Sequence, residues 1–231
     1  MAGTALLRLL QLASPSLPIG AYSYSQGLES AIDLGLVQDA ASARGWIGGQ
    51  LRDVVARFDA PVQWRLLQAF AERDGAALRD WSERWLASRD TFELRAETVQ
   101  MGYSLRQLLV ALLGDGQDDA GCIELLALLD EGSLSLPAAY ACAAAALGVP
   151  APAALLGAVF SWTENQVLVC VKTVPLGQVA GQKMLLALGP VVEDAVRTAL
   201  QLPDGALSNW APGLSLLSMR HKVQYSRLYR S

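Results

Sequence analysis

The apolar positions of this chain recur with the period of an α-helix. Leu51, Val54, Val55 and Phe58 stand at i, i+3, i+4 and i+7, and the same spacing returns from Met101 onward. Residues at this spacing share one face of a helix, whereas a half-buried strand alternates apolar and polar residues. No alternating run of strand length competes with the helical pattern. The sequence therefore predicts an all-α protein.

Glycine and proline divide this pattern into short segments. None of the breaks is long or polar enough to be an interdomain linker. We therefore expect a compact single-domain bundle of roughly eight to ten helices over residues 1–218, followed by a C-terminal tail over residues 219–231. The breaks fall at residues 14–20, 74–80, 114–121, 148–152, 174–177 and 202–205.

Several helix starts are indicated by their residues. Pro61, Pro152 and Pro190 stand where first helical turns would begin, because a first turn does not need the N–H that proline lacks. Asp90 precedes Glu93 by three residues, which is the spacing of a capping box. Gly102 is expected inside the helix that follows, where a glycine usually allows another backbone to approach closely.

Residues 132–163 contain no charged side chain and are numerous enough to span a bilayer. The stretch is rich in alanine, which favours membrane insertion only weakly, and Gly148, Pro150 and Pro152 interrupt it. We predict two buried helices joined by a turn, and no membrane span.

Composition narrows the classes of function. Apolar residues make up 52% of the 231 residues and charged residues 17%, below the usual value of about 25%. This excludes intrinsic disorder and predicts apolar surface that a partner covers. A formal charge of −4 gives no general electrostatic footprint for nucleic acid. Three cysteines at irregular spacing (Cys122, Cys142, Cys170) and no signal-peptide pattern indicate reduced thiols in a cytoplasmic protein.

The sequence offers little that resembles a catalytic site. It contains no GxxxxGK[ST] or GxGxxG phosphate-binding motif and no HExxH, CxxC or HxH metal-binding spacing. The segment from Ser23 to Gly27 lacks the first glycine of GxSxG. If the chain were an enzyme, Ser25 and His221, the only histidine, would be the nucleophile and the base to test. We expect no enzymatic activity.

The end of the chain, residues 219–231, is basic and aromatic. This composition suits a docking peptide, whereas the usual fate of a terminus is to fray in solvent, and both interpretations stay open at this point. The segment has four cationic side chains, no acidic one, and three residues that would give it an apolar side: Arg220, Lys222, Tyr225, Arg227, Leu228, Tyr229 and Arg230.

Four segments, taken in this order and spacing, resemble the urease accessory protein F (UreF) family, whose members serve the maturation of a nickel enzyme. The segments are SPSLPIGAYSYSQGLE (14–29), ELRAETVQMGYSL (93–105), TVPLGQVAGQ (173–182) and HKVQYSRLYRS (221–231). Together they extend over essentially the whole chain, and the first and last are the most specific.

The resemblance implies an all-α cytoplasmic protein that is a non-catalytic scaffold and chaperone. Members of the family dimerise, bind the urease accessory D (or H) protein and recruit the urease GTPase, UreG. The assembly docks on apo-urease and couples GTP hydrolysis to nickel insertion. An alternative is direct regulation of that GTPase, in its activation or its fidelity, with an arginine offered to the phosphates. No cofactor is expected to bind tightly; nickel would pass transiently, with His221 as a weak candidate ligand.

The resemblance also implies partner-binding residues. The tail would pack against the D protein or become ordered on it through Tyr225, Arg227, Leu228, Arg230 and Ser231. A second set would lie on or beside the surface that meets the GTPase: Tyr22, Tyr24, Ser25, Gln26, Glu29 and Lys172. Two positions depart from the family pattern. Tyr229 stands where Phe is common, and Lys222 stands where an acidic residue is common.

Overall fold

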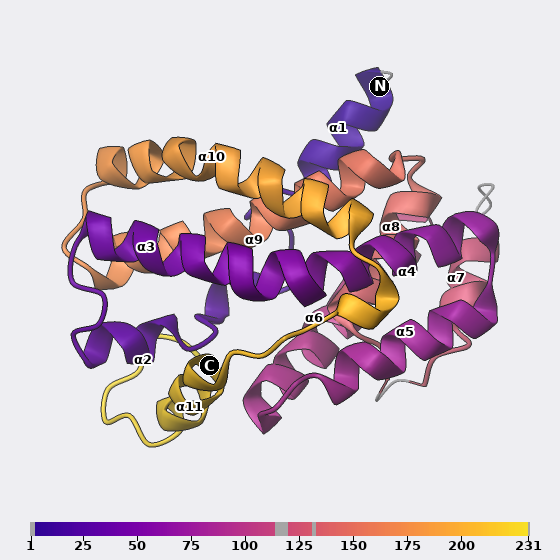
Figure 1. Ribbon diagram of the computed structural model, residues 1–231. Helices are drawn as coiled ribbons and strands as arrows, with labels where there is room; N and C mark the ends of the chain where they lie inside the picture. Colours follow the sequence, from indigo (N-terminus) through magenta and orange to yellow (C-terminus); the bar gives the residue numbers. More distant parts are fainter. Residues whose placement is uncertain (1–2, 114–119, 131–132, 231) are drawn as a thin grey trace. The chain divides into compact units, whose positions relative to one another are not determined.

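The computed structural model describes residues 3–113, 120–130 and 133–230, and every regular element in these ranges is a helix (Figure 1). The all-α prediction is confirmed. With α3 to α4 counted as one continuous helix, these ranges form ten α-helices, the upper end of the predicted range. The elements are α1 (Gly3–Leu12), η1 (Ala21–Ser23), α2 (Leu28–Asp33), α3 (Ala40–Gln50), η2 (Leu51–Asp59), α4 (Ala60–Glu72), α5 (Gly75–Ala87), α6 (Phe92–Leu113), α7 (Ala120–Leu126), α8 (Leu136–Ala146), α9 (Ala151–Thr173), α10 (Gln178–Gln201), η3 (Asp204–Ala206) and α11 (Pro212–His221).

The chain forms two compact units whose segments alternate along the sequence. The first unit contains Met1–Gly20, Val62–Asp90 and Arg95–Ala158, and the second contains Ala21–Pro61, Thr91–Leu94 and Val159–Ser231. The second unit therefore includes both residues 21–29 and the basic C-terminal segment. The division into a helical domain over residues 1–218 and a tail over 219–231 stays a prediction.

In the first unit, a glycine allows the start of α8 to lie directly against α6. A Cβ atom at Gly102 would lie 2.6 Å from the carbonyl carbon of Ser135, which confirms the close backbone approach expected at this glycine. Thr98, one turn earlier on α6, accepts hydrogen bonds from the indole N–H of Trp85 and the backbone N–H of Leu136. Backbone contact and shared hydrogen bonds thus fix α8 on α6.

The elements α3 and η2 of the second unit continue into α4 through Pro61 without a break in the helix. The π-helical element η2 precedes this proline, which lacks the N–H that would bond the carbonyl of Arg57. The backbone N–H of Ser208 donates to that carbonyl instead, at 3.1 Å. Pro61 lies in the first turn of α4, as predicted, but α4 continues from η2 without a break, and a distant segment supplies the donor that the proline lacks.

Two other start signals were misplaced, and one was correct. Pro190 lies inside α10, where its missing N–H faces the carbonyl of the exposed Leu186. The hydroxyl of Thr91, rather than Asp90, accepts the backbone N–H of Leu94 in the first turn of α6. Pro152 lies in the first turn of α9, as predicted.

The charge-free stretch forms α8 and the first half of α9, separated by the break at residues 148–150. Within the described residues, α9 is long and apolar enough to cross a membrane by length and composition alone. Half of its most apolar window is buried, and its amide side chains Asn165 and Gln166 bond backbone carbonyls elsewhere in the second unit. These contacts are typical of a core helix.

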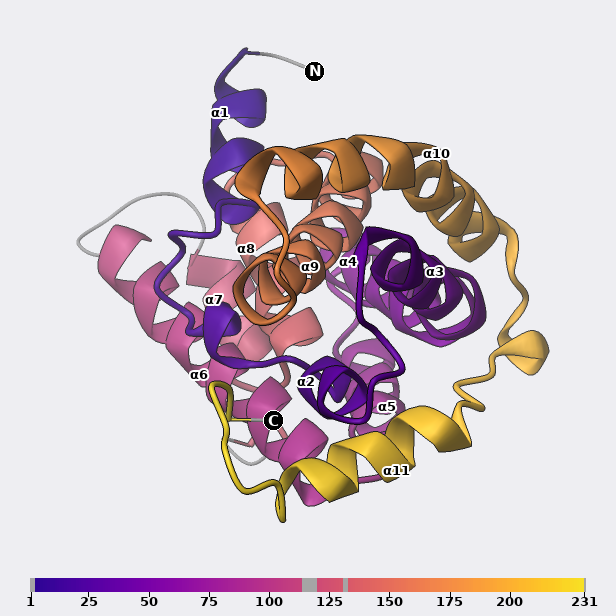
Figure 2. The same cartoon turned by 90° about the vertical axis from the view of Figure 1, so that its left-hand side faces the viewer.

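Two helix pairs organise the second unit. The helix of α3 and η2 packs against α10, and the short α2 packs against α11 (Figures 1 and 2). A tight turn over residues 174–177 joins α9 to α10, and a Cβ atom at Gly181 would lie 2.6 Å from Cγ2 of Val171. The candidate site described below lies on α2, α9 and α11 of the second unit.

Candidate functional site

The segment over residues 21–29 has an irregular backbone that α9 holds in place. After the short helix η1, Gln26 and Gly27 adopt positive φ values of 53° and 82°. The indole N–H of Trp162 donates to the side-chain oxygen of Gln26 at 2.7 Å. The amides of Asn165 and Gln166 donate to the carbonyls of Tyr24 and Ser25. Positions 162, 165 and 166 share one face of α9, so one helix face fixes the whole turn.

Gly27 also allows α11 to cross close to α2. A Cβ atom at this position would lie 3.3 Å from Cδ1 of Leu214 and 3.4 Å from the backbone nitrogen of Ser218. The left-handed conformation and the narrow gap both favour glycine. The crossing brings the end of α11, at His221, over α2.

Glu29 on α2 is the centre of the site. Its side chain is buried, with the residue only 6% exposed, and Nε2 of His221 lies 2.6 Å from Oε2. The backbone N–H of Leu228 donates to Oε1 at 2.6 Å, and that of Tyr229 donates to Oε2 at 3.2 Å. One carboxylate thus binds the end of α11 and the chain that follows it. We call Glu29, His221 and the backbone of residues 228–229 the tail anchor.

Further contacts extend from the tail anchor. The backbone N–H of Arg230 donates to the carbonyl of Ser23 at 2.8 Å, and the hydroxyl of Ser30 donates to the side-chain oxygen of Gln224 at 3.3 Å. Nζ of Lys172, at the end of α9, lies 6.0 Å from the centroid of the Tyr229 ring. Residues 224–230 therefore lie along the turn over residues 21–30.

The ring of Tyr229 is enclosed in this arrangement. Burial, with the nearby Glu29 and Cys170 as smaller causes, raises its pKa to about 12, so the phenol is neutral at physiological pH. Its hydroxyl has no hydrogen-bond partner among the residues that the structure describes. The hydroxyl at this position, where the resemblance implies that Phe is common, is therefore buried.

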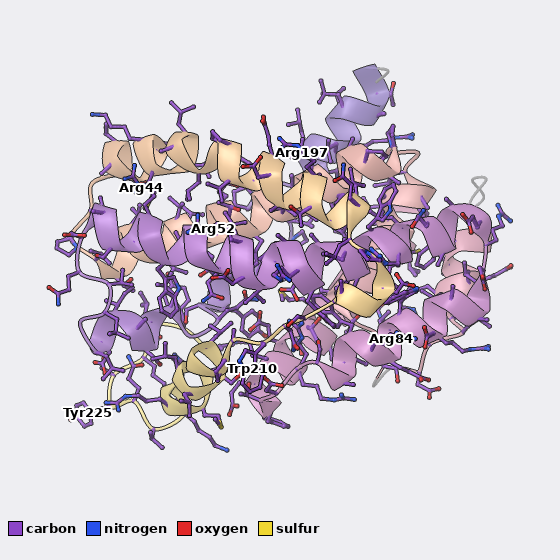
Figure 3. All side chains as sticks on the ribbon, viewed as in Figure 1. Arg44, Arg52, Arg84, Arg197, Trp210 and Tyr225 are labelled. Atoms are coloured by element: carbon purple, nitrogen blue, oxygen red, sulfur yellow. The ribbon has the colours of Figure 1, made fainter. Side chains whose placement is uncertain are left out.

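The outward side chains of the tail are free of the tail anchor. Leu228 is 65% exposed although its backbone is bound, and the cationic side chains of Arg227 and Arg230 are exposed. Tyr225 is fully exposed and projects from the loop after α11 (Figure 3). Tyr22 and Lys172 are exposed on the same unit, whereas Ser231 lies outside the described residues. The backbone of residues 228–230 is anchored, while the side chains of Tyr225, Arg227, Leu228 and Arg230 face solvent.

The described side chains do not converge on a metal site. No group of three or more His, Cys, Asp or Glu residues that could hold a metal ion occurs among them. His221 is completely buried, and its Nε2 atom is bound to Glu29. Burial raises the pKa of the Cys170 thiol to about 12, which disfavours the thiolate that a metal needs.

The pair proposed for an enzyme is not arranged for catalysis. Ser25 is fully buried, and its hydroxyl accepts the backbone N–H of Glu29 at 3.3 Å. The imidazole of His221 is directed to Glu29, so neither side chain is presented to a substrate. A hydrolytic role for this pair has no geometric support.

Comparison with known proteins decides the family. A family model described as UreF matches residues 37–189. The urease accessory protein UreF of Janthinobacterium sp. (strain Marseille) is 64% identical over 233 residues, which is 100% of both chains. That of Nitrosospira multiformis is 59% identical over 98% of both chains, and that of Azoarcus sp. (strain BH72) is 50% identical over 98% of this chain and 95% of its own.

The chain belongs to the UreF family. The resemblance drawn from the four sequence segments is confirmed. The first and last of these segments, which are the most specific to UreF, contact each other in the structure through the tail anchor and the bond between Arg230 and Ser23. UreF is a family of urease accessory proteins.

The structure also changes how the candidate residues are grouped. The family resemblance implied different partners for the tail and for the group of Tyr22 to Glu29 with Lys172, and the structure brings the two groups together in one cluster of the second unit. Glu29 was expected on or beside a surface and is buried. Sequence reasoning missed Trp162, Asn165 and Gln166. A signal for them was present in the sequence, because three side chains that can form hydrogen bonds stand at i, i+3 and i+4 in an otherwise apolar helix.

Proposed function

We propose that this protein is a non-catalytic scaffold and chaperone for urease, which joins the accessory D (or H) protein to the urease GTPase, UreG, during nickel insertion into apo-urease. One observation supports this proposal above all others. The tail backbone is fixed against residues 23–29 while the side chains of Tyr225, Arg227, Leu228 and Arg230 face solvent. A segment held in this way is preorganised for a protein partner.

The tail supplies the contacts that we assign to the D protein. Tyr225, Arg227 and Arg230 supply aromatic and planar cationic groups, which are enriched at interfaces, and Leu228 adds an exposed apolar side chain. Ser231 belongs to the same proposed contact by its position in the sequence.

The neighbouring surface supplies the contacts that we assign to the GTPase. Tyr22 and Lys172 are exposed there, and Gln26 is half-buried. Tyr24, Ser25 and Glu29 are buried, so they serve this surface by shaping the turn rather than by touching the partner. Because the tail lies along residues 21–30, the two surfaces adjoin, and one chain would hold two partners close together.

The remaining parts of the proposal follow from the family. We propose that the protein works in the cytoplasm as a homodimer, that the assembly docks on apo-urease, and that neither nucleic acid nor a membrane is a partner. No cofactor is bound tightly, and nickel passes through the complex as cargo. The buried, reduced cysteines are compatible with a reducing compartment.

Reconstitution tests this function. Apo-urease, the D protein, the GTPase, GTP, bicarbonate and nickel are mixed with and without this chain, and urease activity is measured. We expect activation to require the chain. A family member of known activity shows that the other components are competent. Equal activity without the chain, in a mixture that passes this control, contradicts the proposal.

A second candidate function is direct regulation of the GTPase. It is favoured by the exposed Arg227 and Arg230 side chains, since an arginine donated to a nucleotide site stabilises the charge that develops on the phosphates. Arg227→Ala and Arg230→Ala separate the two functions. Loss of GTPase stimulation in an intact complex supports regulation, whereas loss of assembly supports the scaffold.

A further inference from the structure

We propose that Glu29 and His221 are positioning residues, which hold the tail in the conformation that its partner recognises without touching that partner. This inference rests on the proposed function, in that it requires the tail to be a binding segment. From the sequence, Glu29 would be expected to affect assembly as a charge on or beside the surface. In the structure its carboxylate is buried, and we infer that it affects assembly through the tail.

The hydrogen bonds require a carboxylate at position 29. Oε1 accepts one backbone N–H, from Leu228, and Oε2 accepts another, from Tyr229, together with the ring nitrogen of His221. Both oxygens must act as acceptors. A glutamine amide would turn an NH₂ group toward at least one of these donors, so Glu29→Gln keeps the shape and loses the pairing.

His221 fixes the direction of that carboxylate. Because a carboxylate oxygen carries no hydrogen and can only accept, Nε2 of His221 acts as the donor in the 2.6 Å contact. The imidazole is completely buried between α11 and α2, so it cannot reach a partner. Its role in this geometry is to hold Glu29 in place for the two tail N–H groups.

Lys172 provides a contrast within the same cluster. Its ammonium group lies over the Tyr229 ring, but the side chain is exposed and remains able to contact a partner. If Lys172→Ala weakens binding of a partner, part of that effect should therefore remain in a chain that lacks the tail. The effect of Glu29→Gln on binding should disappear in the same shortened chain.

The first test measures the tail in the free full-length chain. Amide hydrogen exchange is followed at residues 228 and 229 in the wild type, Glu29→Gln, His221→Leu and His221→Gln. We expect Glu29→Gln and His221→Leu to speed exchange at both amides by at least about tenfold, because charge-assisted bonds are lost. His221→Gln, which keeps a donor near the Nε2 position, should largely restore protection. Asp33→Asn, at an exposed carboxylate on α2, is the matched control. Unchanged exchange in Glu29→Gln overturns the proposal.

The second test measures affinity for the D protein and recruitment of the GTPase. Wild type and Glu29→Gln are compared in the full chain and in a chain that ends at Gln224, which retains His221. We expect Glu29→Gln to weaken binding at least about tenfold in the full chain and to have no further effect in the shortened one. An equal effect in both chains means that Glu29 acts on the partner without the tail, which overturns the positioning role. Failure of the wild type to bind either partner instead contradicts the proposed function.

Discussion

Nε2 of His221 and Oε2 of Glu29 lie 2.6 Å apart although 192 positions separate them in the sequence. Both residues are buried, and they belong to α11 and to α2, which α11 approaches closely at Gly27, the residue before α2. When one member of a buried pair is removed, water cannot replace the lost hydrogen bond, and the remaining polar group is left buried without a partner. It therefore contributes to stability as well as to the position of the tail.

Replacing His221 by alanine should destabilise the second unit. The buried carboxylate of Glu29 would lose a charge-assisted hydrogen bond, and we expect the free energy of unfolding to fall by about 1.5 to 3 kcal/mol. Urea denaturation measures the change, and Lys222→Ala, at the next and exposed position, is the control. A loss no larger than that of the control would refute the expectation.

Gly102→Ala should destabilise the first unit. The new methyl group would lie 2.6 Å from the Ser135 carbonyl carbon, and this backbone cannot move without displacing α8. We expect a loss of about 1 to 3 kcal/mol in the free energy of unfolding. Gly45→Ala is the matched control, since Gly45 also lies inside a helix but a methyl group added there would meet no atom within 4 Å. That change should stabilise by up to about 1 kcal/mol, and the same sign for both variants would argue against close packing at Gly102.

Gly27→Ala should loosen α11 from α2. Both Gly27 and Gly20 have positive φ values, of 82° and 79°, but only Gly27 has neighbours within reach of a Cβ atom. Gly20→Ala measures the conformational cost alone, typically about 1 kcal/mol. We expect Gly27→Ala to cost more in thermal unfolding and to increase trypsin cleavage after Arg220 and Lys222. Equal behaviour of the two variants contradicts the proposed crossing.

Stability at alkaline pH should depend on Tyr229. Its pKa is raised from 10.0 to about 12 in the folded chain, so the neutral phenol favours folding below pH 10. This contribution is lost as the pH rises from 10 through 12. Comparison of the free energy of unfolding at about pH 9 and about pH 11 should show a smaller loss in Tyr229→Phe than in the wild type. A larger loss in the variant would show that the phenol does not contribute in this way.

The cysteine thiols should be protected in the native protein. All three are buried, and the pKa of Cys170 is raised to about 12 by that burial. A thiol-reactive dye should label the native chain slowly and should label all three thiols once guanidinium unfolds it. Rapid labelling of Cys170 under native conditions would show that this part of α9 opens.

Local signals explain what the sequence could predict. The spacing of Leu51 to Phe58 predicted a helix without long-range information. Gly102 indicated a close backbone approach, because a glycine inside a helix is destabilising unless the missing side chain is needed for packing. The fate of Pro61 depends on a donor at Ser208, and the burial of Glu29 depends on N–H groups 199 and 200 residues later. No local pattern contains those contacts, so the candidate site was recognised in pieces rather than as one cluster.

The tail is bound to the turn through three consecutive backbone N–H groups, at residues 228, 229 and 230. Backbone donors are common to every residue except proline. The attachment therefore places few demands on the side chains that it displays. The side chains at positions 227, 228 and 230 can therefore differ between related chains, as their partners differ, while the backbone hydrogen bonds that attach the tail stay the same. An engineered tail with new specificity must exclude proline from positions 228, 229 and 230, where the bound N–H groups lie.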